Sequence, residues 1–449
     1  MKQKNKLISG ALYLGLGTFI AKLLGAFYRV PLTNMIGGLG LGLYQMVFPV
    51  YSLLLDFSGA GLPSALSRLI SSKSNQRDTG KRLFINSVKI FSCLGIICSL
   101  IMAIFCRKLA SLQGNEDAYL GYLFLSPAII FVSLISCFRG YFQGNMDMKP
   151  TAISQVVEQV FKLILGIFLV KMFLPNLPLS VGGATLAITI SEIVALLILI
   201  SIYKRKKIDK VCLTNTLATD AKLIIKTVFP ITLVGIMIPL SQVIDSFLTI
   251  NILSKYTSEA TALYGLLSGV VITIINLPIA VCHGISTVAI PSVSSSADDR
   301  ERDVRIKKVI ILTLIIALPC SIFLLAFAPF TINILFRNLQ TAQKQIAIKL
   351  LSMASPCVVL LSLLQTSNAI LIGKGKLYLP VLSLIIGIIV KTILNITLLK
   401  IPQLNIYGGV IAIIACYFVT CLINLILIFT KKVKNEDEQN YIRRCVYQK

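Results

Sequence analysis

The chain consists of long apolar runs separated by short polar segments. About twelve of these runs are long enough to cross roughly 30 Å of hydrocarbon as helices. They cover residues 8–31, 42–70, 84–106, 119–142, 151–174, 179–203, 222–252, 260–292, 306–336, 346–372, 377–399 and 406–430. No segment between them is long enough to form a domain. The pattern therefore predicts an all-α polytopic membrane protein with about 12 transmembrane helices.

The composition agrees with a membrane location. Of the 449 residues, 56% are hydrophobic and only 14% are charged, and the mean hydropathy is +0.86. The first apolar run continues to Pro31 without a convincing cleavage site, so we expect a membrane span there rather than a signal peptide.

Positive charge is distributed unevenly among the connecting segments. The net charge is +25, and basic clusters occur at 204–210 and 298–308. In a twelve-span topology both clusters lie on the same side of the membrane as the N-terminus, and the positive-inside rule places that side in the cytoplasm. We therefore expect both termini, including the polar tail 431–449, to be cytoplasmic. The excess of basic residues therefore indicates the orientation of the chain in the membrane and does not indicate a nucleic-acid partner.

Three segments of the first half match three segments of the second half in the same order. The matched pairs are 61–72 with 284–295, 154–165 with 383–394, and 182–191 with 408–417. Such an internal match indicates duplication of a six-helix unit. Because six spans return the chain to its starting side, the repeats are parallel. We expect an N-lobe (1–208) and a C-lobe (209–430) around a central cavity, as in a transporter.

Charged residues inside the apolar runs are the main functional signal. A charge at the bilayer centre costs about 3 kcal/mol, so each one needs a partner or a hydrated cavity. The charged residues within spans include Lys22, Arg29, Asp56, Glu158, Lys162, Glu192, Asp245 and Lys391. Their number favours a hydrated interior. Lys22 and Arg29 are seven residues apart and share one helix face, although Arg29 could instead snorkel to the lipid headgroups.

Glu158 and Lys162 are four residues apart and therefore share a helix face with Gln155 and Gln159. One interpretation is an internal ion pair that only stabilises packing. Against it, the repeat places Lys391 at the equivalent of Lys162, whereas no acid occupies the equivalent of Glu158. Two cations on matching helices suit an anionic ligand with several charges.

The acidic residues have two open interpretations. Asp56, Glu158, Glu192 and Asp245 could be counter-ions of the basic groups in the empty protein, or sites for a coupling proton or sodium ion. No Walker motif is present, and the glycine-rich stretch 37–42 is expected to be a tight outer turn rather than a phosphate loop. We expect no nucleotide, no cofactor and no metal, and no clustered catalytic constellation points to an enzyme.

The stretch RGYFQGNMDMKPTAISQVVEQVFK (139–162) resembles the polysaccharide-transport branch of the multidrug/oligosaccharidyl-lipid/polysaccharide (MOP) flippase superfamily. Within it, the chain is most similar to the stage V sporulation protein B group, which is related to lipid II flippases. The resemblance implies a two-lobed bundle in the bacterial cytoplasmic membrane. It also implies that an undecaprenyl-pyrophosphate-linked saccharide, an anionic lipid, is flipped by alternating access. The resemblance implies substrate binding by Lys22, Arg29, Arg139, Gln155, Gln159 and Lys162. The internal repeat adds Lys391 to the expected substrate-binding residues.

Some positions depart from the lipid II flippases that the chain resembles. Leu39 replaces an acid, Asp56 stands about where an arginine is usual, and neither Leu266 nor Leu267 supplies the arginine of span 8. These departures leave the saccharide open. Two other functions remain as alternatives, namely a cation-coupled multidrug exporter of the same superfamily and a membrane scaffold for cell-wall or spore assembly that transports nothing.

Overall fold

The computed structural model describes residues 2–72, 77–205, 217–294, 299–376 and 378–430. Within these residues the structure is almost entirely helical and contains no strand, which confirms the predicted fold class. The predicted boundary between the lobes, at residues 208 and 209, and the tail 431–449 lie outside the described residues.

The first half of the chain contains eight α-helices and one π-helix within its described residues. These are α1 (Lys2–Leu55), the π-helix Asp56–Ala60, α2 (Leu62–Ser72), α3 (Arg77–Ile104), α4 (Cys106–Leu112), α5 (Tyr119–Leu125), α6 (Ala128–Gly144), α7 (Lys149–Phe173) and α8 (Leu177–Arg205). A short 3-10 helix, Glu116–Ala118, precedes α5.

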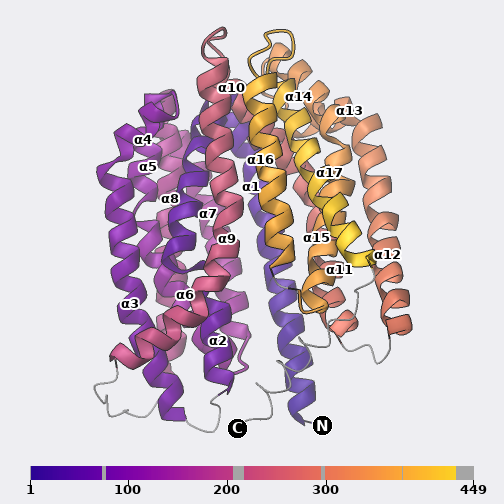
Figure 1. Ribbon diagram of the computed structural model, residues 1–449. Coiled ribbons are helices and arrows are strands. Elements are labelled where there is room, and N and C mark those ends of the chain that lie inside the picture. Colours follow the sequence, from indigo (N-terminus) through magenta and orange to yellow (C-terminus); the bar gives the residue numbers. More distant parts are fainter. Residues whose placement is uncertain (1, 73–76, 206–216, 295–298, 377, 431–449) are drawn as a thin grey trace.

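The second half has a similar series of helices. These are α9 (Leu217–Leu253), α10 (Ala260–Tyr264), the π-helix Gly265–Val271, α11 (Ile272–Ser294), α12 (Asp299–Ala326), α13 (Ala328–Leu335), α14 (Thr341–Ala354), α15 (Pro356–Gly373), α16 (Leu379–Leu398) and α17 (Tyr407–Phe429). In Figure 1 helices α2 to α8 lie on one side of the bundle and α11 to α17 lie on the other, with α1 and α9 in the middle.

Ten segments of the described chain are long and apolar enough to cross a membrane. Tyr13–Ser71 counts as one of them, and α7 is not among them. Glu158 and Lys162 make α7 less apolar than its neighbours, although its 25 residues are long enough to span. Dividing the first segment at its kink and adding α7 restores the predicted twelve.

The first two predicted spans meet within α1, where the helix is broken at Gly37 with φ of 65° and ψ of −171°. The tight turn expected at 37–42 is thus a sharp kink at Gly37, and the residues that follow it are helical. A side chain at Gly42 would overlap the carbonyl oxygen of Thr261, and one at Gly265 would overlap the carbonyl oxygen of Gly38. The glycines therefore let α1 cross the start of the eighth span at close range.

Polar contacts join the two halves at both ends of the bundle. Gln45 donates to the carbonyl oxygen of Ser268 at 2.8 Å. Asn115 donates at 3.1 Å to Thr261 Oγ1 on α10, a helix at the uppermost end of Figure 1. Near the opposite end, Asp220 at the start of α9 pairs with Arg82 of α3 at 3.0 Å. Helix α9 thus contacts the first half near its start, and near its end as well, where Gln113 donates to Ser246 Oγ at 3.1 Å.

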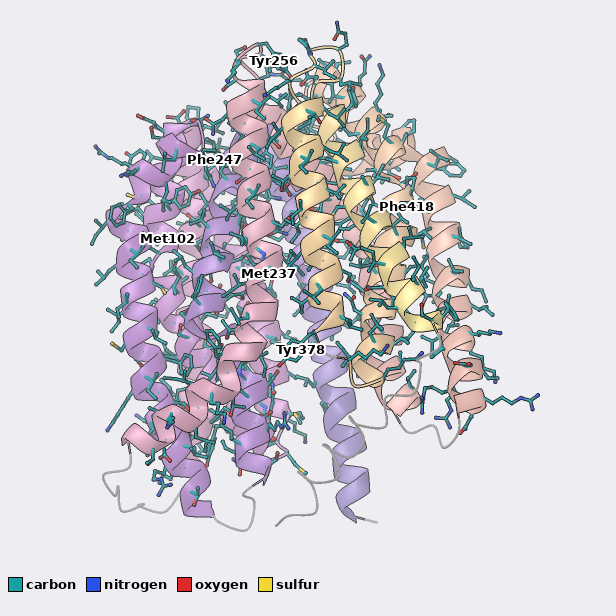
Figure 2. The ribbon with its side chains drawn as sticks, viewed as in Figure 1. Met102, Met237, Phe247, Tyr256, Tyr378 and Phe418 are labelled. Carbon is teal, nitrogen blue, oxygen red and sulfur yellow. The ribbon has the colours of Figure 1, made fainter. Side chains whose placement is uncertain are left out.

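The outer surface of the bundle is apolar. The spanning part of α12 has only 17% of its residues buried, and large side chains such as Phe247 and Phe418 are 42% and 54% exposed. Figure 2 shows these two phenylalanines on the outside of α9 and α17. An exposed apolar surface of this extent is expected where lipid surrounds the protein.

The structure supports the repeat at the matching helices. Helix α7 packs along α8, and α16 packs along α17 in the same way. Ser154 Oγ donates to the carbonyl oxygen of Thr151 at 2.9 Å, and its predicted equivalent Ser383 donates to that of Pro380 at 3.0 Å. Both serines are buried in the second turn of their helices.

Candidate functional site

Four helices of the first half bring charged side chains into one cluster. Arg139 on α6 forms an ion pair with Glu158 on α7, with 2.9 Å between Nη2 and Oε2, and its Nε donates to Ser154 Oγ at 3.1 Å. Gln159 Nε2 donates to the other carboxylate oxygen of Glu158 at 2.8 Å. Glu158 therefore has Arg139 as its cationic partner, and the internal pair with Lys162 is not the arrangement observed.

Lys162 is held by aromatic rings instead of a carboxylate. Its Nζ lies 5.6 Å from the ring centre of Tyr28 and 5.8 Å from that of Phe48, distances at which a cation is attracted to a ring. In the part of the chain that the structure describes, no acidic side chain is within ion-pair distance of it. The charges of Arg29, Glu158 and Glu192 act on Lys162, which places all three near it.

Arg29 connects this cluster to the second half. Its Nη1 donates to Thr273 Oγ1 on α11 at 2.7 Å. The guanidinium group is thus held in the interior between α1 and α11, and the snorkelling conformation is not the one observed. Lys22, seven residues earlier on α1, has an exposed side chain. Gln155 belongs to the same contact between α1 and α7, because its Oε1 accepts from Thr18 Oγ1 at 3.0 Å.

Two acidic residues of the first half differ in their surroundings. Glu192 on α8 is only 6% exposed, and its Oε2 has no hydrogen-bond partner among the described residues. The charges of Glu158, Arg139 and Lys162 act on it, so it belongs to the cluster. Asp56 is half-buried and faces α9, because a Cβ at Gly235 would lie 3.5 Å from its Oδ2.

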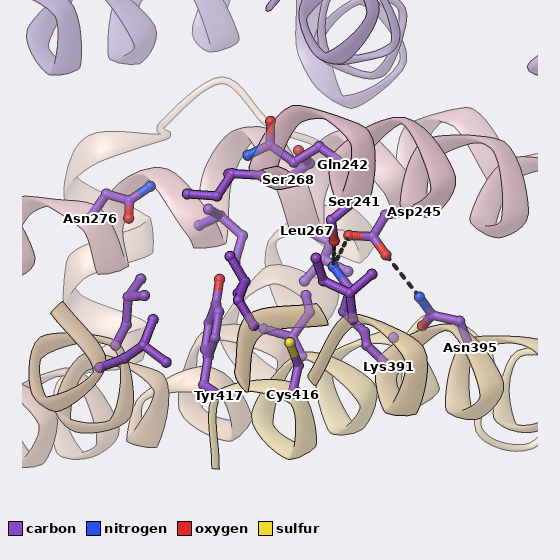
Figure 3. Close-up of a pocket in the computed structure, with 18 of the residues that line it drawn as sticks. Ser241, Gln242, Asp245, Leu267, Ser268, Asn276, Lys391, Asn395, Cys416 and Tyr417 are labelled. Carbon is purple, nitrogen blue, oxygen red and sulfur yellow. Dashed lines mark hydrogen bonds and ion pairs between the residues drawn. The ribbon is translucent and has the colours of Figure 1, made fainter. Parts of the chain in front are cut away.

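The second half contains a different arrangement around Lys391. The Nζ of this buried lysine on α16 lies 2.6 Å from Asp245 Oδ2 on α9 and also donates to Ser241 Oγ. Asn395, one turn further along α16, donates to Asp245 Oδ1 at 3.0 Å. Figure 3 shows this pair and its two polar neighbours on the wall of a cavity. Asp245 thus has the counter-ion position that was one of its two predicted roles.

The cavity has a volume of about 340 Å³ and lies within the second half. Its walls come from α9, the end of α10, the π-helix Gly265–Val271, α11, α15, α16 and α17, and no residue of α1 to α8 lines it. The structure therefore brings Arg29, Arg139, Glu158, Lys162 and Glu192 together in one cluster and places Lys391 with Asp245 in a separate cavity. The single chamber expected to hold Lys22, Lys162 and Lys391 together is not this cavity.

Several contact residues were missed from the sequence. Tyr28 and Phe48 could not be assigned, since nothing in their spacing indicates that they meet Lys162 from elsewhere in the chain. Asn395 had a usable signal, because it follows Lys391 by four residues and so shares its helix face. In the described chain, no group of three His, Cys, Asp or Glu side chains is arranged to hold a metal ion.

A helical membrane bundle with two matching halves and buried charges of both signs belongs to the class of polytopic membrane transporters. The family model described as "Polysaccharide biosynthesis protein" matches residues 7–297, and the chain belongs to that family. It is a transporter of the MOP superfamily.

Relatives of known name cover most of the chain. The lipid II flippase MurJ of Bacillus subtilis (strain 168) is 28% identical over 94% of this chain and 82% of its own length. Stage V sporulation protein B of the same organism is 27% identical over 92% of this chain and 81% of its own length.

Two solved structures share the fold. One is an inward-facing MATE-family multidrug resistance transporter of the MOP superfamily, with a TM-score of 0.76 and 16% identity over 90% of this chain and 93% of that one. The other is lipid II flippase MurJ in an inward closed conformation, with a TM-score of 0.74 and 19% identity over 94% of this chain and 88% of that one. At this identity the likeness concerns the fold alone.

Proposed function

We propose that the protein flips an undecaprenyl-pyrophosphate-linked saccharide across the bacterial cytoplasmic membrane by alternating access. The observation that carries the proposal is Lys162, a cation inside a membrane bundle that has aromatic rings beside it and, among the described residues, no carboxylate within ion-pair distance. The relatives support the cargo class, because one of them is named a lipid II flippase. The saccharide itself is left open.

The cluster in the first half has the chemistry of a pyrophosphate site. Arg139 is engaged with Glu158, so the cations available to a ligand are Lys162 and Arg29. A phosphate group accepts charge-assisted hydrogen bonds from both lysine and arginine. Lys22, exposed on the same helix, is proposed to meet the head group on entry. Gln155 and Gln159 supply neutral donors beside the cluster.

Lys391 has a conditional place in this proposal. Its predicted role as a phosphate-binding group requires its ion pair with Asp245 to open, whereas Lys162 needs no such change. The prenyl tail stays in the lipid while the head group passes between the halves.

Glu192 is the best candidate for coupling transport to an ion gradient. It is a buried carboxyl group with one oxygen that has no partner among the described residues, and it shares the cluster with Lys162. Proton or sodium binding at Glu192, or the membrane potential acting on the cluster, supplies the energy. Asp56 is the second candidate. Both termini lie in the cytoplasm in this proposal.

Reconstituted protein tests the proposal. Lys162→Gln and Arg29→Gln should each lower the flipping rate of an undecaprenyl-pyrophosphate-linked saccharide in proteoliposomes by about tenfold or more, because each removes a charge-assisted contact. Lys400→Gln, which changes an exposed lysine after α16, is the matched control and should flip normally.

The alternatives predict different results. Normal flipping by folded Lys162→Gln and Arg29→Gln protein would contradict the proposed site. If the unchanged protein exports cationic dyes but does not flip the lipid, it is a multidrug exporter. If it does neither, a membrane scaffold is the better description.

A further inference from the structure

The cavity of the second half carries no net charge on its walls. Asp245 and Lys391 are the charged residues among those that line it, and they are paired with each other. A pyrophosphate would find no free cation there. A ligand that enters this cavity is therefore expected to be neutral.

The remaining polar groups of the cavity are amides and hydroxyls. Gln242 on α9 and Asn276 on α11 are exposed carboxamides, and neither has a hydrogen-bond partner within the described residues. Tyr417 on α17 also lines the cavity, and Figure 3 shows its hydroxyl pointing away from its own helix toward the elements that carry Ser268 and Asn276. Each carboxamide offers both donors and an acceptor, which matches the hydroxyl groups of a sugar.

The shape of the cavity also suits a sugar. Its volume of about 340 Å³ is near the lower end of the usual range of ligand pockets. It therefore has room for a head group of roughly one or two rings. Tyr264 and Tyr417 line it with aromatic ring surface, against which the apolar face of a sugar ring can pack.

The cavity adjoins the cationic cluster of the first half. Ile272 lines the cavity, and the next residue, Thr273, accepts the hydrogen bond from Arg29. A ligand whose phosphate contacts Arg29 can thus extend its next group across Thr273 toward Asn276, one helical turn further along α11.

We propose that this cavity is the saccharide-binding part of the transport site, and that it recognises neutral sugar hydroxyls next to a pyrophosphate held by Arg29 and Lys162. The inference rests on the proposed function and deepens it. The two halves divide the head group, because the first half binds its charge and the second half binds its sugar. Gln242 and Asn276 are the specificity-determining residues.

Two lipids that differ only in the sugar test the division. Binding of undecaprenyl pyrophosphate and of undecaprenyl-pyrophosphate-linked N-acetylglucosamine to the purified full chain is measured by native mass spectrometry. Asn276→Leu and Gln242→Leu should each weaken binding of the sugar-bearing lipid by roughly tenfold, because each removes hydrogen bonds to the ligand. Binding of the sugarless lipid should stay unchanged. Gln345→Leu, an exposed residue of α14 outside the cavity, is the matched control.

The outcomes separate this inference from the proposed function. If Asn276→Leu and Gln242→Leu weaken binding of both lipids equally, or weaken binding of neither, the proposal that the cavity binds the saccharide is wrong. Lys162→Gln should weaken binding of both lipids equally. If it weakens binding of neither lipid, the proposed function is overturned instead. Because both cavity residues are exposed, the leucine variants are expected to fold. Asn276→Ser, which keeps a smaller polar group, gives a second variant with an intermediate loss.

Discussion

The two halves of the molecule use equivalent lysines in different ways. Lys162 on α7 has aromatic rings around it, whereas Lys391 on α16 is bonded to Asp245, Ser241 and, through Asp245, to Asn395. The duplicated helices thus keep the position of the lysine and change its surroundings. A cation that has no carboxylate within ion-pair distance remains available to an anionic ligand. A cation that is paired with a carboxylate, as Lys391 is, adds no net charge to the cavity wall.

The same contrast extends to the neighbouring helices. In the first half, Arg139 bonds both Ser154 and Glu158. In the second half, the offset that aligns Ser154 with Ser383 places Asn368 at the position of Arg139 and Gly387 at that of Glu158. Ser383 donates to Asn424 at 2.6 Å, and Asn424 donates to Asn368 at 2.7 Å. An amide network therefore replaces a charged one on the same scaffold.

Breaking the ion pair of the second half should have the largest effect on stability. Lys391→Met leaves the carboxylate of Asp245 in a largely buried site without its cation, which should lower the free energy of unfolding by about 3 kcal/mol. The double variant Lys391→Met with Asp245→Asn should recover most of that loss, since no uncompensated charge remains. Thermal unfolding in detergent measures both, with Lys400→Met as the exposed control. Equal stability of the single and double variants would contradict the neutral pair.

Filling the space at Gly387 should have the next largest effect. A Cβ there would overlap Thr420 Oγ1 and lie 3.0 Å from the carbonyl oxygen of Cys416, so α16 and α17 would have to separate. Gly387→Ala should therefore destabilise the protein by about 2 kcal/mol. This contact explains why the second half has no acid where the first half has Glu158.

The control for this prediction is another helical glycine. Gly15 has no heavy atom within 4 Å of an added Cβ, so Gly15→Ala should be neutral or slightly stabilising. Adding Thr420→Ala should relieve part of the Gly387→Ala effect. Thermal unfolding of the four proteins measures this, and a Gly387→Ala variant as stable as Gly15→Ala would show that the helices are not in close contact.

Removing the ion-pair partner of Glu158 in the first half should have the smallest effect, and this effect should be on the flipping rate. Arg139→Gln removes the cationic partner of Glu158, and the freed carboxylate can then attract Lys162 on the same helix face. Flipping in proteoliposomes should fall by about tenfold. Adding Glu158→Gln should restore much of the rate, because Lys162 then has no freed carboxylate on its own helix face. An additive double variant would mean that Arg139 contacts the cargo directly.

The sequence by itself determined the fold class and named most of the charged residues inside the bundle. Both follow from the hydrocarbon thickness of the bilayer, which sets the length of each apolar run and makes every charge inside one conspicuous. The repeat was also visible, because Ser154, Lys162 and their partners Ser383 and Lys391 keep one register.

Only the tertiary structure decided which charges meet. Glu158 has Lys162 four residues away on its own helix but pairs with Arg139, and Lys391 pairs with Asp245 on a helix far earlier in the chain. The structure also placed the break between the first two predicted spans at Gly37 and the cavity in the second half. Helical spacing indicates which residues share a face, but partners on other helices depend on how those helices pack, and no local pattern encodes that.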